Sequence, residues 1–397
     1  MKEGWRMVKL GEVCESRLGK TLNSLTDVGK PYNYLCSVNI QWDKIDLSVL
    51  KTTLFTNDEI EKYRIQKGDL LVCEGGEAGR SAIWENEEPI LYQNALHRIR
   101  FKNGVMIPRF CLHYLRKIKN DGTIDKDFAR GATIKHLVTK SLYSIPIPLP
   151  PLEEQHRIVS ILDASFEKID ALKKNAEENL KNAKALFQQV LAQELKPKEG
   201  WVEKKLGEIA DFVRGPFGGS LTKSIFKESG YAVYEQQHAI HHHVNIRYFI
   251  DENKFDEMKR FEVKPGDLIM SCSGTIGEVY IIPLDAPVGV INQALLKLSV
   301  SSQLDRCYFK SWLESPIFKE IILKYSKGAA IPNVPGVKIL KDINIVLPPL
   351  EEQHRIVRTL DTLSEKCRRL EQVAQQTIRE CDALKQSILR QAFSGEL

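Results

Sequence analysis

Four histidines lie close together in the second half of the chain, at positions 238, 241, 242 and 243. Imidazole is the commonest metal ligand in proteins, so this cluster is a candidate metal site. Adjacent side chains point in different directions on a helix or a strand, however, and at most two of the four can share one ion. The first half of the chain has no counterpart. The sequence therefore favours a solvent- or DNA-facing loop over a metal centre.

Eight cysteines offer thiolate chemistry, but their spacing indicates none. They stand at positions 14, 36, 73, 111, 272, 307, 367 and 381, without a CxxC pair. A structural zinc site usually takes its ligands from two closely spaced pairs, and disulfides are unusual in a reducing cytosol. We therefore predict buried or idle thiols and no metal.

Two glycine-containing segments suggest phosphate binding at first sight. Gly19-Lys20-Thr21 has the end of a phosphate-binding loop, but the glycine required five residues before Gly19 is replaced by Cys14. The clusters GGEAGR and GPFGGS lack the dinucleotide-binding spacing and are typical of turns. No Asn-Pro-Pro-aromatic motif of amino-methyltransferases is present, and no nuclease cluster stands out. The chain is therefore expected to be no enzyme by itself and to bind no cofactor.

An internal repeat is the strongest feature of the sequence. The segment LPPLEEQHRIV at 149–159 recurs unchanged at 347–357, which is 198 residues later. Upstream landmarks recur in the same order, for example GWRMVKLGEV at 4–13 and GWVEKKLGEI at 200–209. The sequence predicts a tandem duplication of one unit, a globular module followed by a long helix.

Proline-rich segments, IPIPLPPL and INIVLPPL, separate module from helix in each copy. Proline lacks an amide donor and disfavours helix before it, so these segments end a strand and begin a helix. The residues that follow contain no Pro or Gly until Pro197 in the first copy and Gly395 in the second. The predicted domains are a first module (1–150), a central helix (151–197), a second module (198–348) and a C-terminal helix (349–397).

Both helices carry apolar residues at alternating spacings of four and three, which is typical of a coiled-coil seam. A helix of about 40 residues spans about 60 Å, more than a small domain, so the two helices are expected to pack on each other, antiparallel, with the modules related by a pseudo-two-fold axis. A flanking row on the first helix (Val159, Phe166, Leu180, Phe187) widens its apolar face for an additional partner. The predicted seam residues are Leu162, Ile169, Ala176, Ala183, Val190, Leu360, Leu363, Cys367, Leu370, Ala374, Cys381, Leu384 and Ile388.

The modules have an α+β or mixed α/β pattern. Short strands are predicted at 69–73, 96–101, 267–271 and 294–300, and short amphipathic helices at 108–118 and 304–315. Hydrophobic residues make up 43% of the chain and charged residues 27%, as in ordinary globular proteins.

The net charge and the apolar runs limit the partners. No run of eighteen apolar residues and no signal-peptide pattern is present, so we expect no membrane partner and a cytoplasmic protein. The net charge is +5, and the basic surplus lies in the modules rather than in the helices. This distribution permits nucleic-acid binding without requiring it.

These motifs together resemble the specificity subunits of type I restriction–modification systems. Each module begins GWxxxxLGE, the first carries a GDLLxxxxGxxGR-type turn, and both close in PPLxEQ before a long helix; the chain ends in ILRQAFSGEL. The resemblance covers essentially the whole chain. It implies two target-recognition domains that each read one half of a bipartite double-stranded DNA site. Modules held apart by a rigid rod suit half-sites about one helical turn apart, roughly 34–36 Å.

The resemblance also implies partner subunits. The helices would set the half-site spacing and dock methyltransferase subunits, two being expected, and a motor-nuclease subunit is a further partner. S-adenosylmethionine, ATP and magnesium would serve those partners. Two alternatives stay open: a recognition subunit of a fused methyltransferase–nuclease system, and a coiled-coil scaffold protein that binds no DNA.

Differences between the two copies point to DNA-reading residues, because modules that read different sequences share their scaffold. Gln93 and Asn94 are echoed in the second copy and are assigned to scaffold hydrogen bonding. The candidate base-reading residues come from segments with little correspondence: Arg17, Lys20, Asn23, Gln41, Arg214, Ser220, Gln236, Gln237 and His238. The candidate phosphate contacts are basic residues on predicted loops: Arg80, Arg130, Lys135, Lys223 and Lys327.

Overall fold

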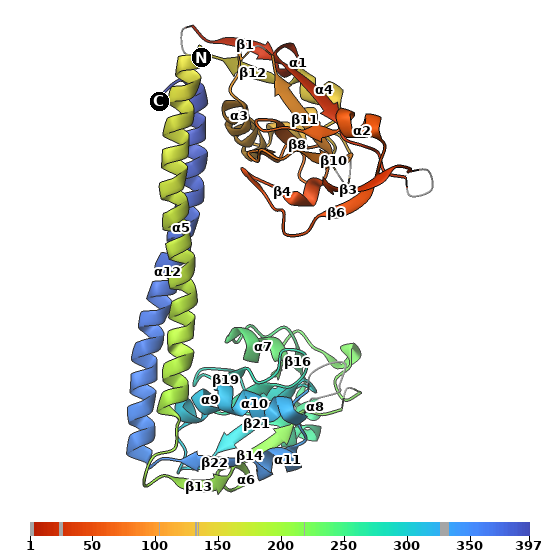
Figure 1. Cartoon of the computed structure of the whole chain (residues 1–397). Helices are drawn as coiled ribbons and strands as arrows, with labels where there is room; N and C mark the ends of the chain where they lie inside the picture. The colour runs from red at the N-terminus through yellow and green to blue at the C-terminus, as the bar shows by residue number, and fades with distance from the viewer. Residues whose placement is uncertain are drawn as a thin grey trace. The chain divides into compact units, whose positions relative to one another are not determined.

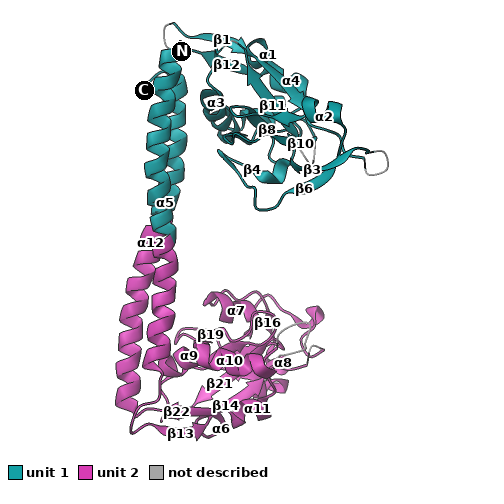
Figure 2. Cartoon of the chain, viewed as in Figure 1, with its two compact units in different colours: residues 1–177, 376–397 teal, residues 178–375 magenta. Residues whose placement is uncertain are grey.

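The chain forms two compact units. The computed structural model describes residues 4–23, 27–102, 104–131, 133, 135–217, 219–325 and 333–397. Unit 1 comprises residues 1–177 and 376–397, and unit 2 comprises residues 178–375 (Figure 2). Each unit contains one module and parts of two long helices, α5 (Leu152–Glu194) and α12 (Leu350–Ser394) (Figure 1).

Module 1 is built on three principal sheets. Strand β1 (Arg6–Lys9) pairs antiparallel with β12 (Pro146–Leu149) and so ties the start of the module to its end. An antiparallel sheet has the order β2 (Cys14–Leu18), β11 (Leu96–Phe101), β8 (Leu70–Cys73), β9 (Ser81–Ile83). A mixed sheet has the order β6 (Lys51–Phe55), β3 (Lys30–Leu35), β10 (Ile90–Tyr92), β7 (Arg64–Ile65), in which β3 and β10 are parallel.

Short helices and one further pair of strands complete module 1. The pair is β4 (Ile40–Gln41) with β5 (Lys44–Ile45). The helices are α1 (Leu10–Val13), α2 (Asn57–Lys62), α3 (Pro108–Asn120) and α4 (Thr139–Ser144), with a π-helical turn at Ile124–Phe128. Helix α3 is amphipathic and buries one side against the antiparallel sheet, where Phe110, Cys111 and Leu115 share a core with Leu70 and Ile99.

Module 2 repeats these sheets strand for strand. Its outer pair is β13 (Val202–Lys205) with β22 (Asn344–Leu347), and its antiparallel sheet has the order β14 (Ala210–Arg214), β21 (Leu295–Val300), β18 (Leu268–Ser271), β19 (Val279–Ile281). The mixed sheet has the order β16 (Phe249–Ile250), β15 (Tyr231–Tyr234), β20 (Gly289–Ile291), β17 (Glu262–Val263), with β15 and β20 parallel. The helices are α6 (Leu206–Ile209), α7 (Gln236–His241), α8 (Glu252–Glu257), α9 (Arg306–Glu314), α10 (Pro316–Tyr325) and α11 (Val337–Asp342).

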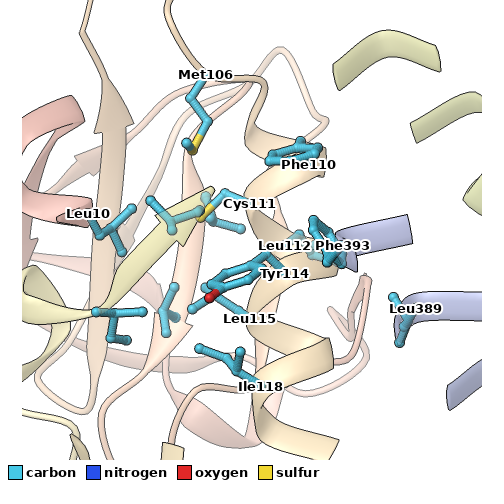
Figure 3. Close-up of a cluster of buried hydrophobic side chains, with 14 of the residues drawn as sticks. Leu10, Met106, Phe110, Cys111, Leu112, Tyr114, Leu115, Ile118, Leu389 and Phe393 are labelled. Carbon is cyan, nitrogen blue, oxygen red and sulfur yellow. The ribbon is translucent and has the colours of Figure 1, made fainter. Parts of the chain in front are cut away.

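The end of α12 completes the core of module 1. The Phe393 ring lies edge-on to two rings of α3, with centroids 5.1 Å from Phe110 and 5.2 Å from Tyr114 (Figure 3). Leu389 of α12 and Leu162 near the start of α5 belong to the same buried cluster. Unit 1 therefore joins the first module to the last residues of the chain.

Module 2 is completed in the converse way. Leu191 and Leu195, at and just after the end of α5, join Ile356 and Leu360 at the start of α12 in one buried cluster with Trp312 of α9. Within unit 1, Lys173 Nζ lies 2.6 Å from Asp382 Oδ1, and Asp170 is paired with Lys385. Rising numbers on α5 thus face falling numbers on α12, so the helices pack antiparallel, as predicted.

The repeated PPLEEQ motif has a structural explanation in its glutamine. The Gln353 side chain is fully buried; its Oε1 accepts from the Asp305 amide (2.8 Å), and its Nε2 donates to the carbonyls of Gln303 (3.1 Å) and Pro348 (2.9 Å). Gln155 makes the equivalent three bonds in module 1. Buried polar groups must be paired, so each glutamine locks the first turn of a long helix to the loop before α9 or α3.

One of the two predicted seam rows is buried. It consists of Leu162, Ile169, Ala176 and Ala183 on α5 and of Leu360, Cys367, Ala374 and Cys381 on α12. Val190, Leu363 and Ile388 are half-buried.

The prediction is wrong for Leu370 and Leu384, whose side chains are 55% and 48% exposed. The second seam row lies four residues after the first, not three, and contains the half-buried Lys173, Ile378 and Lys385. The two lysines are tolerated there because each pairs with an aspartate of the facing helix. Counting apolar residues therefore selects the wrong row on α12. On α5 the second row contains Phe166 and Phe187, which were expected to face an additional partner but pack against the buried clusters of the two units.

A polar cluster joins module 1 to helix α5. Arg109 of α3 donates through Nη1 and Nη2 to the Asp43 carboxylate (both 2.9 Å) and through Nε to Asp163 of α5 (2.5 Å). The buried His113 ring lies 2.8 Å from the other Asp163 oxygen. Burial raises the pKa of Asp163, but the hydrogen bonds from His113 and Arg109 outweigh it and hold that pKa below its usual value.

The thiols agree with the prediction of an inert role. All eight cysteines are free and seven are buried, Cys307 being exposed. Burial raises the pKa of Cys14 and Cys272 to about 12 and that of Cys73 to about 11, so these thiols stay protonated. In the part of the chain that the structure describes, no helix is both long and apolar enough to cross a membrane.

Candidate nucleic-acid interface

Four loops of module 1 meet at one end of its antiparallel sheet. Backbone hydrogen bonds join them: the Gly19 amide donates to Leu96 O (3.0 Å), the Glu74 amide to Ala95 O (2.9 Å), and the Leu137 amide to Glu74 O (2.7 Å). We call this surface loop face 1; its described residues are 19–23, 74–80, 93–95, 130–131, 133 and 135–137. The sequence-predicted Arg130 and Lys135 lie on it, and both are exposed.

Module 2 has the same frame. The Gly215 amide donates to Leu295 O (2.9 Å), the Cys272 amide to Ala294 O (2.9 Å), and the Val334 amide to Cys272 O (3.0 Å). We call this surface loop face 2; its described residues are 215–217, 219–223, 272–278, 292–294 and 333–334. The two loop faces share their backbone connections, so they differ mainly in side chains and loop length.

Residues shared by both copies support the frame, in line with their assignment to scaffold. The Asn94 amide donates to Lys20 O (2.7 Å) and the Asn292 amide to Tyr234 O (2.9 Å). Asn292 Oδ1 accepts from the Ala294 amide (3.1 Å). A Cβ atom added to Gly215 would lie 1.8 Å from Asn292 O, so only glycine fits where the loop leaves the sheet.

Comparison with known proteins identifies the family. The model of the type I restriction modification DNA specificity domain matches residues 2–182 and 198–380. The chain belongs to this family. Its two modules are DNA specificity domains, and its function is DNA sequence specificity.

Relatives and solved structures agree over most of the chain. The type I restriction enzyme EcoBI specificity subunit of Escherichia coli is 26% identical over 376 residues, which is 87% of this chain and 77% of the relative. The MjaVIII specificity subunit of Methanocaldococcus jannaschii is 24% identical, over 100% of this chain and 93% of its own length. A chain from a structure of a type I R-M system has 25% identity and a TM-score of 0.79, covering 100% of this chain and 99% of that one. The HsdS subunit from Thermoanaerobacter tengcongensis shares the fold, with a TM-score of 0.60 and 24% identity.

Two predicted base-reading residues of the second DNA specificity domain, Arg214 and Gln236, contact loop face 2. Arg214 Nη2 donates to Asn333 Oδ1 (2.9 Å), and Gln236 Nε2 donates to Ser273 O (2.5 Å). Both side chains are half-buried at the rim of loop face 2. Gln237 Nε2 donates to Glu235 (3.0 Å), and the Ser220 amide donates to Phe217 O (2.9 Å).

Lys20 is not a base-reading residue in this structure. Its side chain is buried, with Nζ donating to Leu54 O (2.7 Å) and Glu59 (2.8 Å) and lying 3.2 Å from Asp27. Burial lowers the pKa of Lys20, but the two carboxylates outweigh it and raise that pKa above its usual value. The lysine is an internal cation that holds the loop before β3 against α2.

His238 is also internal, which corrects the prediction that it reads bases. Its ring is fully buried; Nδ1 accepts from the Glu235 amide (2.8 Å), which leaves Nε2 to donate to Asn245 O (3.1 Å). Burial lowers the pKa of His238, so the ring is neutral. It fixes the turn around α7.

The remaining base-reading candidates of the first domain lie on its surface. Arg17 on β2, Asn23 on loop face 1 and Gln41 on β4 have exposed side chains. Gln41 Nε2 makes only a long contact to Val38 O, at 3.4 Å. Their position leaves them accessible to a ligand but does not bring them into one cluster.

The phosphate-contact candidates divide in the same way. Arg80 does not remain a candidate, because Nη1 donates to Glu77 (3.0 Å) and Nη2 to Ser37 O (2.9 Å). Lys223, like Arg130 and Lys135, is exposed. Lys327 lies outside the described residues.

One histidine of the cluster, His242, lies near two carboxylates in an arrangement that could hold a metal ion. Ligand atoms of His242, Glu278 and Glu314 lie within 4.8 Å of one another. Each carboxylate already pairs with a lysine, Glu314 with Lys310 (2.5 Å) and Glu278 with Lys319 (3.2 Å). We assign no metal site here, because the lysines supply the charge that an ion would.

Sequence reasoning missed two features. The Arg109 cluster joins residues far apart in sequence, and no local pattern marks it. Phe217, in the loop after β14, is 94% exposed. An aromatic residue inside the glycine-rich segment GPFGGS was the available signal, since turns seldom need an aromatic ring.

Proposed function

We propose that each module reads one half of a bipartite duplex DNA site through its loop face. The observation that carries this proposal is the repeated backbone frame with divergent side chains. A shared frame suits the constant geometry of the phosphate backbone, and divergent side chains suit different base edges. Exposed cations on the faces, Arg130, Lys135 and Lys223, add the charge that phosphate requires.

The helices carry a candidate surface for methyltransferase subunits. The exposed leucines that the seam leaves out all lie three residues after a buried seam position: Leu172 and Leu384 in unit 1, Leu186 and Leu370 in unit 2. In an antiparallel pair such positions of the two helices flank the same side of the seam. The numbering that pairs Asp170 with Lys385 puts Leu172 level with Leu384. Each unit thus presents an apolar patch of similar make-up, which favours two equivalent partners.

Chemistry would then belong to the partners. Under this proposal the methyltransferase subunits use S-adenosylmethionine, a motor-nuclease subunit uses ATP and magnesium, and this chain contributes recognition only, in the cytoplasm. Methylation-sensitive sequencing of host DNA tests the proposal. We expect a split motif methylated on both strands, and an unmodified genome in the presence of active partners would refute it.

Charge variants test the loop faces directly. In the complex with its methyltransferase, Arg130→Ala or Lys223→Ala should weaken binding to all duplexes uniformly and reduce the slope of log K against log salt by about 1. Lys174→Ala, an exposed change on α5, is the matched control. An equal effect of all three variants would remove the assignment of the loop faces.

Helix variants test the partner surface. Leu172→Ser with Leu384→Ser should release a methyltransferase subunit from unit 1 while the chain stays folded, as measured by native mass spectrometry and circular dichroism. The equivalent pair, Leu186→Ser with Leu370→Ser, should release a subunit from unit 2. Retention of both subunits by the combined variant would show that these leucines do not dock them.

A further inference from the structure

Phe217 exposes an aromatic ring on loop face 2. Its side chain is 94% exposed. Aromatic rings dominate the energetics of cores and interfaces, so a ring left in water at a recognition surface indicates a ligand that covers it.

The base of the loop is held firmly. The Gly215 amide donates to Leu295 O (2.9 Å), and its α-carbon is pressed so closely on Asn292 that no side chain fits. Pro216 is buried, and its ring fixes the φ angle of the residue that precedes Phe217. The Ser220 amide donates to Phe217 O (2.9 Å) and holds the backbone that carries the ring. These contacts direct Phe217 away from the module instead of into its core.

The surroundings of the ring suit a nucleic acid. Arg214 immediately precedes the loop, and the exposed Lys223 follows it within six residues of Phe217. An exposed apolar ring within a few residues of cations, on a face proposed to read DNA, matches side chains that wedge between base pairs while neighbouring cations contact phosphate. Module 1 has Thr21 two residues after Gly19, the counterpart of Gly215, and so lacks an aromatic ring at the corresponding place.

We propose that Phe217 is a wedge that inserts between two stacked base pairs in the half-site read by module 2. This inference rests on the proposed function of loop face 2. Pyrimidine–purine steps unstack most easily, so the half-site of module 2 is expected to contain such a step at the wedge. Module 1 carries no such ring, so an unstacked step other than the methylated position is expected only in the module 2 half-site.

The test uses the full complex with its methyltransferase and a duplex that carries the methylated motif. 2-Aminopurine is placed at each position of both half-sites in turn. Because a methyltransferase turns its target base out of the duplex, fluorescence should rise at the methylated position of each half-site. The native complex should show a further rise, at one other step, in the module 2 half-site only. Phe217→Ala should abolish that rise and weaken binding by about 5- to 100-fold, the loss expected for one base–aromatic stack. Phe217→Trp should retain both.

The control variant is Leu284→Ala, because Leu284 is 85% exposed in the same module but follows β19 at the far end of the sheet from loop face 2. It should leave fluorescence and affinity unchanged. If the native complex binds its motif with fluorescence rises at the methylated positions only, and Phe217→Ala binds equally well, the wedge is refuted while the proposed function stands. If Phe217→Ala instead loses a methyltransferase subunit, the ring contacts protein and the wedge is likewise refuted. Failure of the native complex to bind any split motif would remove the proposed function, and the wedge with it.

Discussion

Replacing Asp163 by asparagine should weaken the attachment of module 1 to helix α5. The carboxylate accepts from Arg109 Nε at 2.5 Å and lies 2.8 Å from the His113 ring, so the variant weakens two charge-assisted contacts. Such bonds contribute about 1.5–3 kcal/mol each when well desolvated. Asp163 is 33% exposed, and solvent screening reduces this. We expect a loss of about 1–2 kcal/mol in the stability of unit 1.

Amide hydrogen exchange measures this loss where it occurs. Protection of α3 and of the first turns of α5 should fall in Asp163→Asn by about 5- to 30-fold, the factor that corresponds to that free energy. The matched control is Asp361→Asn, at the same place in the second repeat. There the positions of Arg109 and His113 are held by Cys307 and Ser311, so no equivalent cluster exists. Unchanged exchange in α3, or an equal effect of the control, would refute the reasoning.

The same cluster predicts a pH dependence. The pKa of Asp163 is held below its unfolded value, so its contribution to stability is complete above the unfolded pKa, near 4. The contribution is lost as the pH falls through the lower, folded pKa. On acidification below about pH 4, unit 1 of the native protein should therefore lose more stability than unit 1 of the Asp163→Asn variant. Parallel acid unfolding curves for both proteins would contradict this.

Two further outcomes follow from the buried groups. Gln353→Leu should destabilise unit 2 by about 2–4 kcal/mol, because it leaves the Asp305 amide and two carbonyls without partners. Urea unfolding followed by tryptophan fluorescence measures this loss of stability. A loss below about 0.5 kcal/mol would contradict the anchoring role of Gln353. Under native conditions a maleimide reagent should modify Cys307 alone, since the other seven thiols are buried; rapid labelling of Cys367 or Cys381 would show that the helix seam opens.

Much of the fold was predictable because its signals are local or repeated. The strand at 96–101 was predicted with its observed bounds, and the one at 267–271 to within a residue. The PPLEEQ repeat located both long helices. The second seam row was not predictable by apolar counting on α12, because Lys385 occupies it and its acid partner, Asp170, lies on the other helix.

The candidate site was less predictable. Lys20 and His238 are polar residues in divergent segments, and nothing local distinguishes them from surface residues. Only the tertiary partners, Glu59 for the lysine and Asn245 O for the histidine, show that they are internal. Arg214 and Gln236 reach loop face 2 through contacts with Asn333 and Ser273, which are distant in sequence.

The contribution of Phe393 and Leu389 to the core of module 1 affects the order in which the protein matures. These residues are translated after the whole of module 2, whereas the rings of Phe110 and Tyr114 that they cover are made before it. During synthesis part of the apolar face of α3 stays uncovered until α12 has been made. Module 2 closes on a segment of α5 made before it. The module that is translated first is thus the one completed last, and a chain that stops before Phe393 lacks part of the core of its first module.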